Sequence, residues 1–124
     1  MERNKDRSRA EMEAQIDHAM RNATDPDEGE VVLVARYDHA NALLILELKS
    51  GQRIAIPTED IQGLAGAAPE DISDIELLGP GTGLHWEKLD ADFSVRGLVA
   101  GRYGSEKWMQ GLAQRRRERL SRAS

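Results

Sequence analysis

The chain has 124 residues and no cysteine, with 40% hydrophobic and 31% charged residues, which is typical of one small soluble domain. The lack of cysteine excludes disulfides, thiolate metal sites and cysteine nucleophiles. No apolar run approaches the roughly 20 residues that span a bilayer, and the charged start of the sequence does not resemble a secretory signal. We therefore expect a cytoplasmic protein.

The net charge of −5 is distributed unevenly along the chain. Residues 1–30 carry five basic and nine acidic side chains, residues 31–101 carry five and eleven, and residues 102–124 carry seven and two. The acidic body repels phosphate, which disfavours nucleic-acid binding by the protein as a whole. The basic tail alone is suited to an acidic partner.

The first segment consists of good helix formers. Met12, Ile16 and Met20 recur every four residues, which predicts a helix over residues 8–22 with one narrow apolar stripe. Residues 22–30 combine proline, glycine and four acidic side chains without periodicity, and we interpret them as a linker.

The centre of the sequence is rich in β-branched and aliphatic residues. It predicts strands over residues 30–38, 42–49 and 53–57, with burial on both faces near the start of the first strand. Gly51 is expected in a tight hairpin between the second and third strands. The three strands therefore form an antiparallel meander.

Next along the chain we expect a short helix and a further strand. Thr58 is the predicted N-cap of the helix, and Pro69 is predicted to end it. Residues 75–78 are the predicted fourth strand. The glycine-rich stretch "GPGTG" that follows lacks the lysine and hydroxyl of a phosphate-binding loop, so it is interpreted as a plain loop.

The last third predicts one short strand and two helices. His85 and Trp86 form the strand, Ser94 caps a short helix that Gly101 ends, and Ser105 caps a helix over residues 106–122. The fold class is therefore α+β: a small antiparallel sheet, consisting of a three-stranded meander plus a fourth strand, packed with short helices, an N-terminal helix and a C-terminal arginine-rich helix.

We divide the chain into three parts on this basis. Residues 1–29 form the N-terminal helix and acidic linker, residues 30–103 form the α+β core domain, and residues 104–124 form the C-terminal basic helix.

Three blocks of the sequence carry a resemblance to a known family. They are the hairpin leading into "IAIP", the block "LAGAAPEDISDIELLGPGTGLHW", and the block "LDADFSVRGLVAGR". In this order they resemble the bacterial and phage family catalogued as domain of unknown function 2442 (DUF2442), over roughly residues 30–117. The resemblance implies a small α+β fold without an established activity. Genes of the family often lie beside small toxin-like partners, which implies an antitoxin-like or regulatory role.

The stretch "HWEKLDAD" is the strongest candidate for chemistry. His85 with Asp90 and Asp92 is a combination found in general bases and metal sites. However, His18, His39 and His85 show no metal-ligand spacing to one another, and no second catalytic group is evident.

A structural interpretation of this stretch is favoured. Trp86 is expected in the core, His85 outside it, and the two aspartates near the free backbone N–H groups that begin the following helix. The expected structural signature consists of Gly83, His85, Trp86, Asp90, Asp92 and Gly101. Binding of a small molecule at His85, Asp90 and Asp92 remains a weaker alternative.

The C-terminal helix is the preferred interaction site. Its first two turns carry an apolar face, and the run "RRRER" that follows holds four arginines in five residues. We predict a non-enzymatic protein-interaction module, antitoxin-like or regulatory, without cofactor or metal. Its partner is a protein, such as a small toxin-like protein or a second copy in a homodimer. The alternative is a transcriptional regulator that binds nucleic acid through the arginines. The predicted partner-binding residues are Trp108, Met109, Leu112, Arg115, Arg116 and Arg119.

Overall fold

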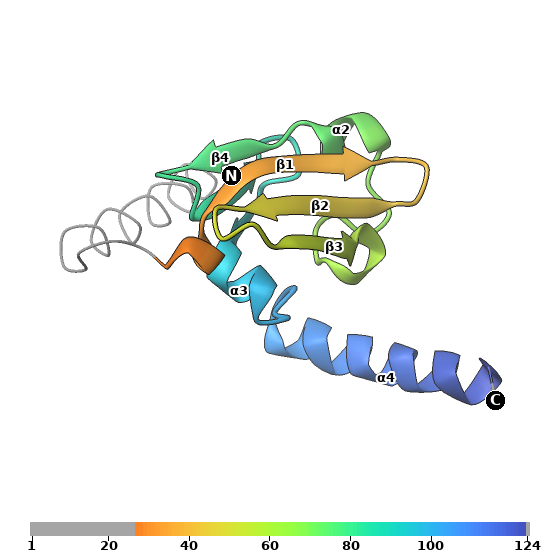
Figure 1. The fold of residues 1–124 in the computed structure, drawn as a ribbon. Helices are drawn as coiled ribbons and strands as arrows, with labels where there is room; N and C mark the ends of the chain where they lie inside the picture. The colour runs from red at the N-terminus through yellow and green to blue at the C-terminus, as the bar shows by residue number, and fades with distance from the viewer. Residues whose placement is uncertain (1–26, 124) are drawn as a thin grey trace.

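The computed structural model of the protein describes residues 27–123 (Figure 1). The helix predicted for residues 8–22 lies outside the described residues, as does most of the predicted linker. The described chain begins with the short 3-10 helix η1 (Glu28–Glu30), whose N-cap Asp27 accepts a hydrogen bond from the backbone N–H of Gly29.

The predicted meander is confirmed. Strands β1 (Val32–Asp38), β2 (Leu43–Leu48) and β3 (Arg53–Pro57) form an antiparallel sheet in the order β1-β2-β3. Gly51 has φ +93° and its N–H donates to Leu48 O at 2.9 Å, which closes the β2–β3 hairpin.

The strand predicted over residues 75–78 is present as β4 (Glu76–Leu78), but its predicted place in the meander is wrong. It belongs to a second antiparallel sheet with β5 (Gly83–Trp86) and β6 (Ala91–Ser94), in the order β4-β5-β6. The physical reason is the glycine-rich turn after β4. Gly79 and Gly81 both have positive φ, so the chain reverses at once and β4 pairs with β5.

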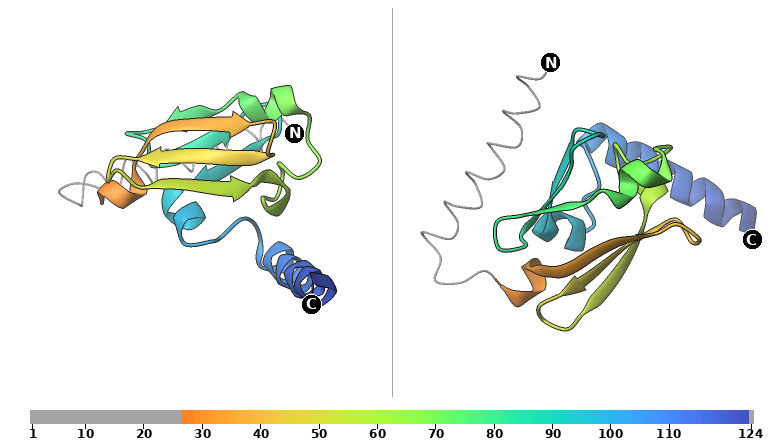
Figure 2. Two further views of the ribbon diagram at one scale, coloured as in Figure 1. Left: turned by 45° about the vertical axis from the view of Figure 1, so that its right-hand side comes forward. Right: turned by 90° about the horizontal axis from the view of Figure 1, so that it is seen from above.

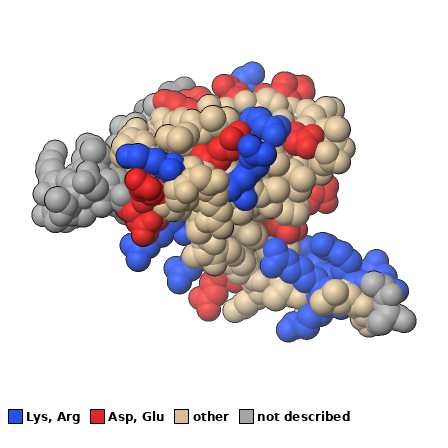
Figure 3. All heavy atoms as spheres, viewed as in Figure 1, with Lys and Arg blue, Asp and Glu red and all other residues tan. Residues whose placement is uncertain are grey.

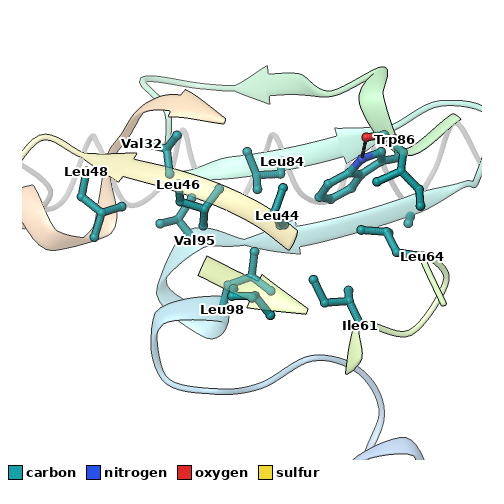
Figure 4. Close-up of a cluster of buried hydrophobic side chains, with 13 residues drawn as sticks. Val32, Leu44, Leu46, Leu48, Ile61, Leu64, Leu84, Trp86, Val95 and Leu98 are labelled. Atoms are coloured by element: carbon teal, nitrogen blue, oxygen red, sulfur yellow. Dashed lines mark hydrogen bonds between the residues drawn. The ribbon is translucent and has the colours of Figure 1, made fainter. Parts of the chain in front are cut away.

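The two sheets face each other with the core between them (Figures 2 and 4). Leu44 and Leu46 of β2 contribute from one side, and Leu84 and Trp86 of β5 contribute from the other. All four side chains are essentially inaccessible to solvent. The buried cluster consists of Val32, Leu44, Leu46, Leu48, Ile56, Ile61, Leu64, Ile72, Leu84, Trp86, Ala91, Val95 and Leu98.

The sheets are also joined through their backbones. The N–H of Val32, at the start of β1, donates to Gly81 O in the β4–β5 turn at 2.8 Å. Val31 and Val32 are both buried, but Leu33 and Val34 are exposed, so the predicted burial on both faces does not extend beyond the first residue of β1.

The helix predicted between Thr58 and Pro69 is wrong. The chain instead forms the 3-10 helix η2 (Thr58–Asp60), then turns, then α2 (Pro69–Ser73). Gly63 and Gly66 have φ of +91° and +77°, which interrupts any helix. Pro69 begins α2 because its fixed φ suits the first helical turn.

Thr58 does not act as the predicted cap. Its hydroxyl donates to Ala42 O at 3.2 Å, and no side chain caps η2. The side chain therefore ties the end of β3 to the start of β2.

The two final helices follow the prediction more closely. Helix α3 (Val95–Val99) is capped by Ser94, whose hydroxyl accepts from Gly97 N at 3.0 Å, and Gly101 follows it with φ +87°. Helix α4 (Glu106–Ala123) projects from the body (Figure 1). Within residues 27–123, no helix is long and apolar enough to cross a membrane.

Candidate functional site

His85 lies in β5, the central strand of the second sheet, directly opposite Asp92 of β6. Its side chain has no exposed surface, so the prediction that His85 lies outside the core is wrong. Neighbouring residues of a strand point to opposite faces. Because Leu84 and Trp86 point into the core between the sheets, the ring of His85 lies on the other face of its sheet.

Both ring nitrogens of His85 meet carboxylates. Nδ1 contacts Oδ1 of Asp92, and Nε2 lies 2.5 Å from Oε2 of Glu87. The Asp92 side chain is buried at 7% exposure, whereas Glu87 is 54% exposed. The second oxygen of Asp92, Oδ2, is buried and has no hydrogen-bond partner among the described residues.

The two carboxylates control the charge of the ring. Burial of the ring disfavours its protonation, but hydrogen bonds to Glu87 and Asp92 and their negative charges outweigh this effect. The pKa of His85 is therefore raised above its ordinary value of 6.5. A protonated ring donates from both nitrogens and has no lone pair left to accept a substrate proton. The arrangement suits a clamp across the β5–β6 hairpin better than a general base.

This clamp predicts a pH dependence of stability. The folded state holds the His85 proton more tightly than the unfolded state, so the stabilisation is complete below pH 6.5 and is lost as the pH rises through the raised pKa. We expect the free energy of unfolding, measured in urea, to fall as the pH increases above 6.5. The variant His85→Asn should lack this step. An unchanged pH profile in the variant would show that other groups cause the decline.

Asp90 and Asp92 do not serve the start of α3, so that part of the structural interpretation is wrong. Asp90 has φ +48° and lies in the turn between β5 and β6, where its N–H donates to Glu87 O at 3.3 Å. Asp92 is within β6 and faces His85. Ser94 alone supplies the helix cap. The structure thus brings His85 and Asp92 together and gives Asp90 a turn role.

The remaining signature residues have structural positions. Trp86 is fully buried as expected, and its Nε1–H donates to Ile72 O at 2.8 Å. Gly83 is a buried residue of β5. His39 lies in the exposed β1–β2 turn beside Tyr37, and His18 is outside the described residues. Among residues 27–123, no cluster of three or more histidine, aspartate or glutamate side chains could hold a metal ion.

The first half of α4 docks on the body through Asp60. Nε1–H of Trp108 donates to the Asp60 carbonyl at 2.8 Å, and the guanidinium of Arg116 lies 3.1 Å from Asp60 Oδ2. Leu112 is buried at 1% exposure, and the sulfur of Met109 lies 3.2 Å from Tyr103 N. Four of the six predicted partner-binding residues therefore contact the body of the same chain.

The second half of α4 is exposed along its length. Every described side chain from Ala113 to Arg122 is exposed. The guanidinium of Arg115 lies 5.0 Å from the Trp108 ring centroid, and Arg122 pairs with Glu118 at 3.9 Å. Figure 3 shows that positive charge gathers over α4, while negative charge is spread over the body.

Sequence reasoning missed three residues that matter to these two sites. Glu87 is the second carboxylate at His85, Asp60 anchors α4, and the ring of Tyr103 lies 5.8 Å from the Arg116 guanidinium. Of these, only Glu87 could have been found from the sequence. It lies two residues after His85, which is close enough for its carboxylate to contact the His85 ring. Asp60 and Arg116 are 56 residues apart, and no local pattern links them.

Two three-stranded antiparallel sheets, short connecting helices and a projecting terminal helix define a small α+β protein. The chain belongs to the family described as protein of unknown function (DUF2442), whose model matches residues 32–104. This match confirms the family resemblance seen in the sequence.

Two solved structures are similar to the chain. One is a crystal structure of a protein of unknown function from Rhodospirillum rubrum, with 44% identity, a TM-score of 0.60, and coverage of 64% of this chain and 95% of that one. The other is a solution structure of an uncharacterized protein from Chromobacterium violaceum, with 26% identity, a TM-score of 0.60, and coverage of 79% and 84%. No match was found among curated proteins.

Proposed function

We propose that the protein is a non-enzymatic interaction module that presents the distal half of α4 to an acidic surface of a partner protein. The antitoxin-like or regulatory role implied by the family resemblance is part of this proposal. The observation that carries it is the exposure of α4 from Ala113 to Arg122 beside a body that is acidic overall.

The packing of α4 supports this proposal. Helices in proteins gain most of their stability from a packed face, and short isolated helices are marginal in water. The distal half of α4 has no buried side chain from Ala113 to Arg122, and of the interactions described here only those of Arg116 with Asp60 and Tyr103 tie it to the body. Arg117 and Arg119 make no ion pair with any other described residue. A partner surface would supply both the packing and the carboxylates.

The state of His85 also supports a non-enzymatic role. Both ring nitrogens of His85 are occupied by carboxylates, which also raise its pKa, and neither nitrogen is free to take a proton from a substrate.

Charge reversal on α4 tests the proposal. We expect the triple variant Arg115→Glu, Arg117→Glu and Arg119→Glu to lose the acidic partner that copurifies with the wild-type chain from its native host. The matched control reverses three exposed cations of the body, Arg36, Lys49 and Lys88, and should retain the partner. Loss of the partner in both variants, or in neither, contradicts the assignment to α4.

The nucleic-acid alternative is tested on the same proteins. A few phosphate contacts from one helix predict a log–log salt slope of magnitude about two to four, with Kd for duplex DNA no tighter than about 10⁻⁵ M at physiological salt. Fluorescence anisotropy with random-sequence and native upstream duplexes at two salt concentrations measures both quantities. Submicromolar binding that prefers the native sequence would overturn the protein-partner proposal.

A further inference from the structure

A groove of about 930 Å³ runs beside β6. Six consecutive residues, Leu89 to Ser94, line one side of it. Side chains alternate between the two faces of a sheet, so a groove over one face would be lined by every second residue. Because every residue of this run lines the groove, the groove follows the edge of the strand. The opposite wall consists of residues 62–63 and 104–105. Arg96 and Gly97 of α3 and the residue that follows this helix, Ala100, close one end.

The edge of β6 that faces this groove carries unused backbone groups. Val95 N donates to Thr82 O at 2.9 Å, so by the alternation of antiparallel ladders Phe93 also bonds to β5. Asp92 and Ser94 then direct their backbone groups away from β5. The N–H and C=O of Asp92 and the N–H of Ser94 have no hydrogen-bond partner within residues 27–123.

The opposite wall is held mainly by its own contacts and approaches β6 at Ala91, where a Cβ on Gly63 would lie 3.4 Å from Ala91 Cβ. Gln62 N donates to Tyr103 O at 2.8 Å, and the Gln62 side chain accepts from Ser105 N at 2.8 Å. Gly104 fits closely here, since a Cβ on it would lie 2.7 Å from both Gln62 Cβ and Trp108 Cδ1. These contacts fix residues 62 and 103–105, so this wall of the groove is preformed.

The charges that line the groove differ between its ends. Asp90 lies at the turn end, and Arg96 and Arg102 lie at the α3 end. One oxygen of the Asp92 carboxylate contacts His85, and the other is buried without a partner among the described residues. Arg96 reaches Glu30 only at 3.8 Å, and the Arg102 side chain has no ion pair or hydrogen bond among the described residues. The α3 end therefore favours a negatively charged group.

We propose that the open edge of β6 binds an extended peptide segment of a partner protein, which adds a strand to the second sheet and places an acidic side chain against Arg96 and Arg102. One residue of the added strand bonds to both backbone groups of Asp92, and the next bonding position meets the N–H of Ser94. This site goes beyond the proposed function, because it uses neither the distal half of α4 nor its arginines.

Ser94 offers a matched pair of variants. Ser94 has φ −80°, which proline accommodates, and proline is tolerated on a strand edge whose N–H faces outward. Ser94→Pro removes the N–H that faces the groove and places its ring there. Both variants lose the Ser94 hydroxyl that caps α3, but Ser94→Ala keeps the backbone N–H. The two variants therefore differ at the backbone group that faces the groove.

The experiment pans a phage-displayed library of random decapeptides against the full chain and synthesises the most enriched peptide for fluorescence anisotropy. We expect enriched peptides to contain aspartate or glutamate among β-forming residues. Relative to wild type, Ser94→Pro should weaken binding at least tenfold and Ser94→Ala by less than threefold. Arg102→Glu, an exposed substitution that does not threaten the fold, should shift enrichment toward lysine-containing and arginine-containing peptides.

Three results in the binding experiment would overturn this proposal, and a fourth comes from α4. The three are the absence of enrichment over the unselected library, equal binding by the two Ser94 variants, and full binding by both of two peptides, each methylated on a different alternate set of backbone nitrogens. The triple charge reversal on α4 should leave peptide binding unchanged. If it abolishes binding, the peptide occupies α4 and the β6 proposal is wrong, whereas loss of only the copurified partner leaves the β6 site intact.

Discussion

Replacement of Trp86 by alanine is expected to lower the free energy of unfolding by about 3–5 kcal/mol, the usual effect of truncating a large buried aromatic side chain. Trp86 is the largest fully buried side chain of the described residues. Its ring packs edge-on against Phe93 with centroids 6.3 Å apart, and its Nε1–H donates to Ile72 O. The change therefore leaves both a cavity and an unpaired buried carbonyl. Urea denaturation measures the loss.

Two controls separate the contributions to this effect. Trp86→Phe keeps most of the packing and removes only the hydrogen bond, so it should fall between wild type and Trp86→Ala. Trp108→Ala removes a partly exposed tryptophan at the base of α4 and should destabilise the core less. A loss below about 1 kcal/mol for Trp86→Ala would contradict its position in the core.

The second large effect is expected at Gly81, where the two sheets meet. Gly81 has φ +102°, and a Cβ on it would lie 2.4 Å from Val32 O. Alanine would add this clash to a left-handed backbone that by itself costs roughly 1–2 kcal/mol. We expect Gly81→Ala to lower the free energy of unfolding by about 3 kcal/mol or more, by the same urea measurement.

Gly51 provides the control for this substitution. It has a similar φ of +93°, but a Cβ on it would have no other atom within 4 Å. Gly51→Ala should therefore show the backbone strain alone, about 1–2 kcal/mol. Equal losses at the two glycines would mean that the contact between Gly81 and Val32 is not restrictive.

The parts of the fold that the sequence predicted correctly depend on local patterns. The meander follows from alternating aliphatic residues and the Gly51 hairpin, and the Ser94 cap follows from hydroxyl preference at a helix start. These preferences depend on residues only a few positions apart, so the elements can be predicted without knowing how the rest of the chain folds.

The errors arise where pairing between segments decides the structure. β4 has only three residues, and its membership of a second sheet depends on the turn that returns the chain to β5. The contact between His85 and Asp92 depends on the register that places them opposite each other. The local sequence around Asp60 suggests only a helical first turn, because its contact with Arg116 appears only when α4 is docked.

Leu112 is the one buried apolar side chain among the described residues of α4, and the helix is otherwise held by the bonds of Trp108 and Arg116 to Asp60. This has a consequence for how the molecule opens. Regions with few buried apolar contacts separate from the rest at low free energy, in cooperative units of their own. The helix and the two-sheet core are then different units, and α4 can detach, exchange its amide hydrogens or be cleaved while the core stays folded. Apart from Arg116, which contacts Asp60, sequence changes on the distal half of α4 are correspondingly free to alter what the helix recognises without a penalty to the stability of the core.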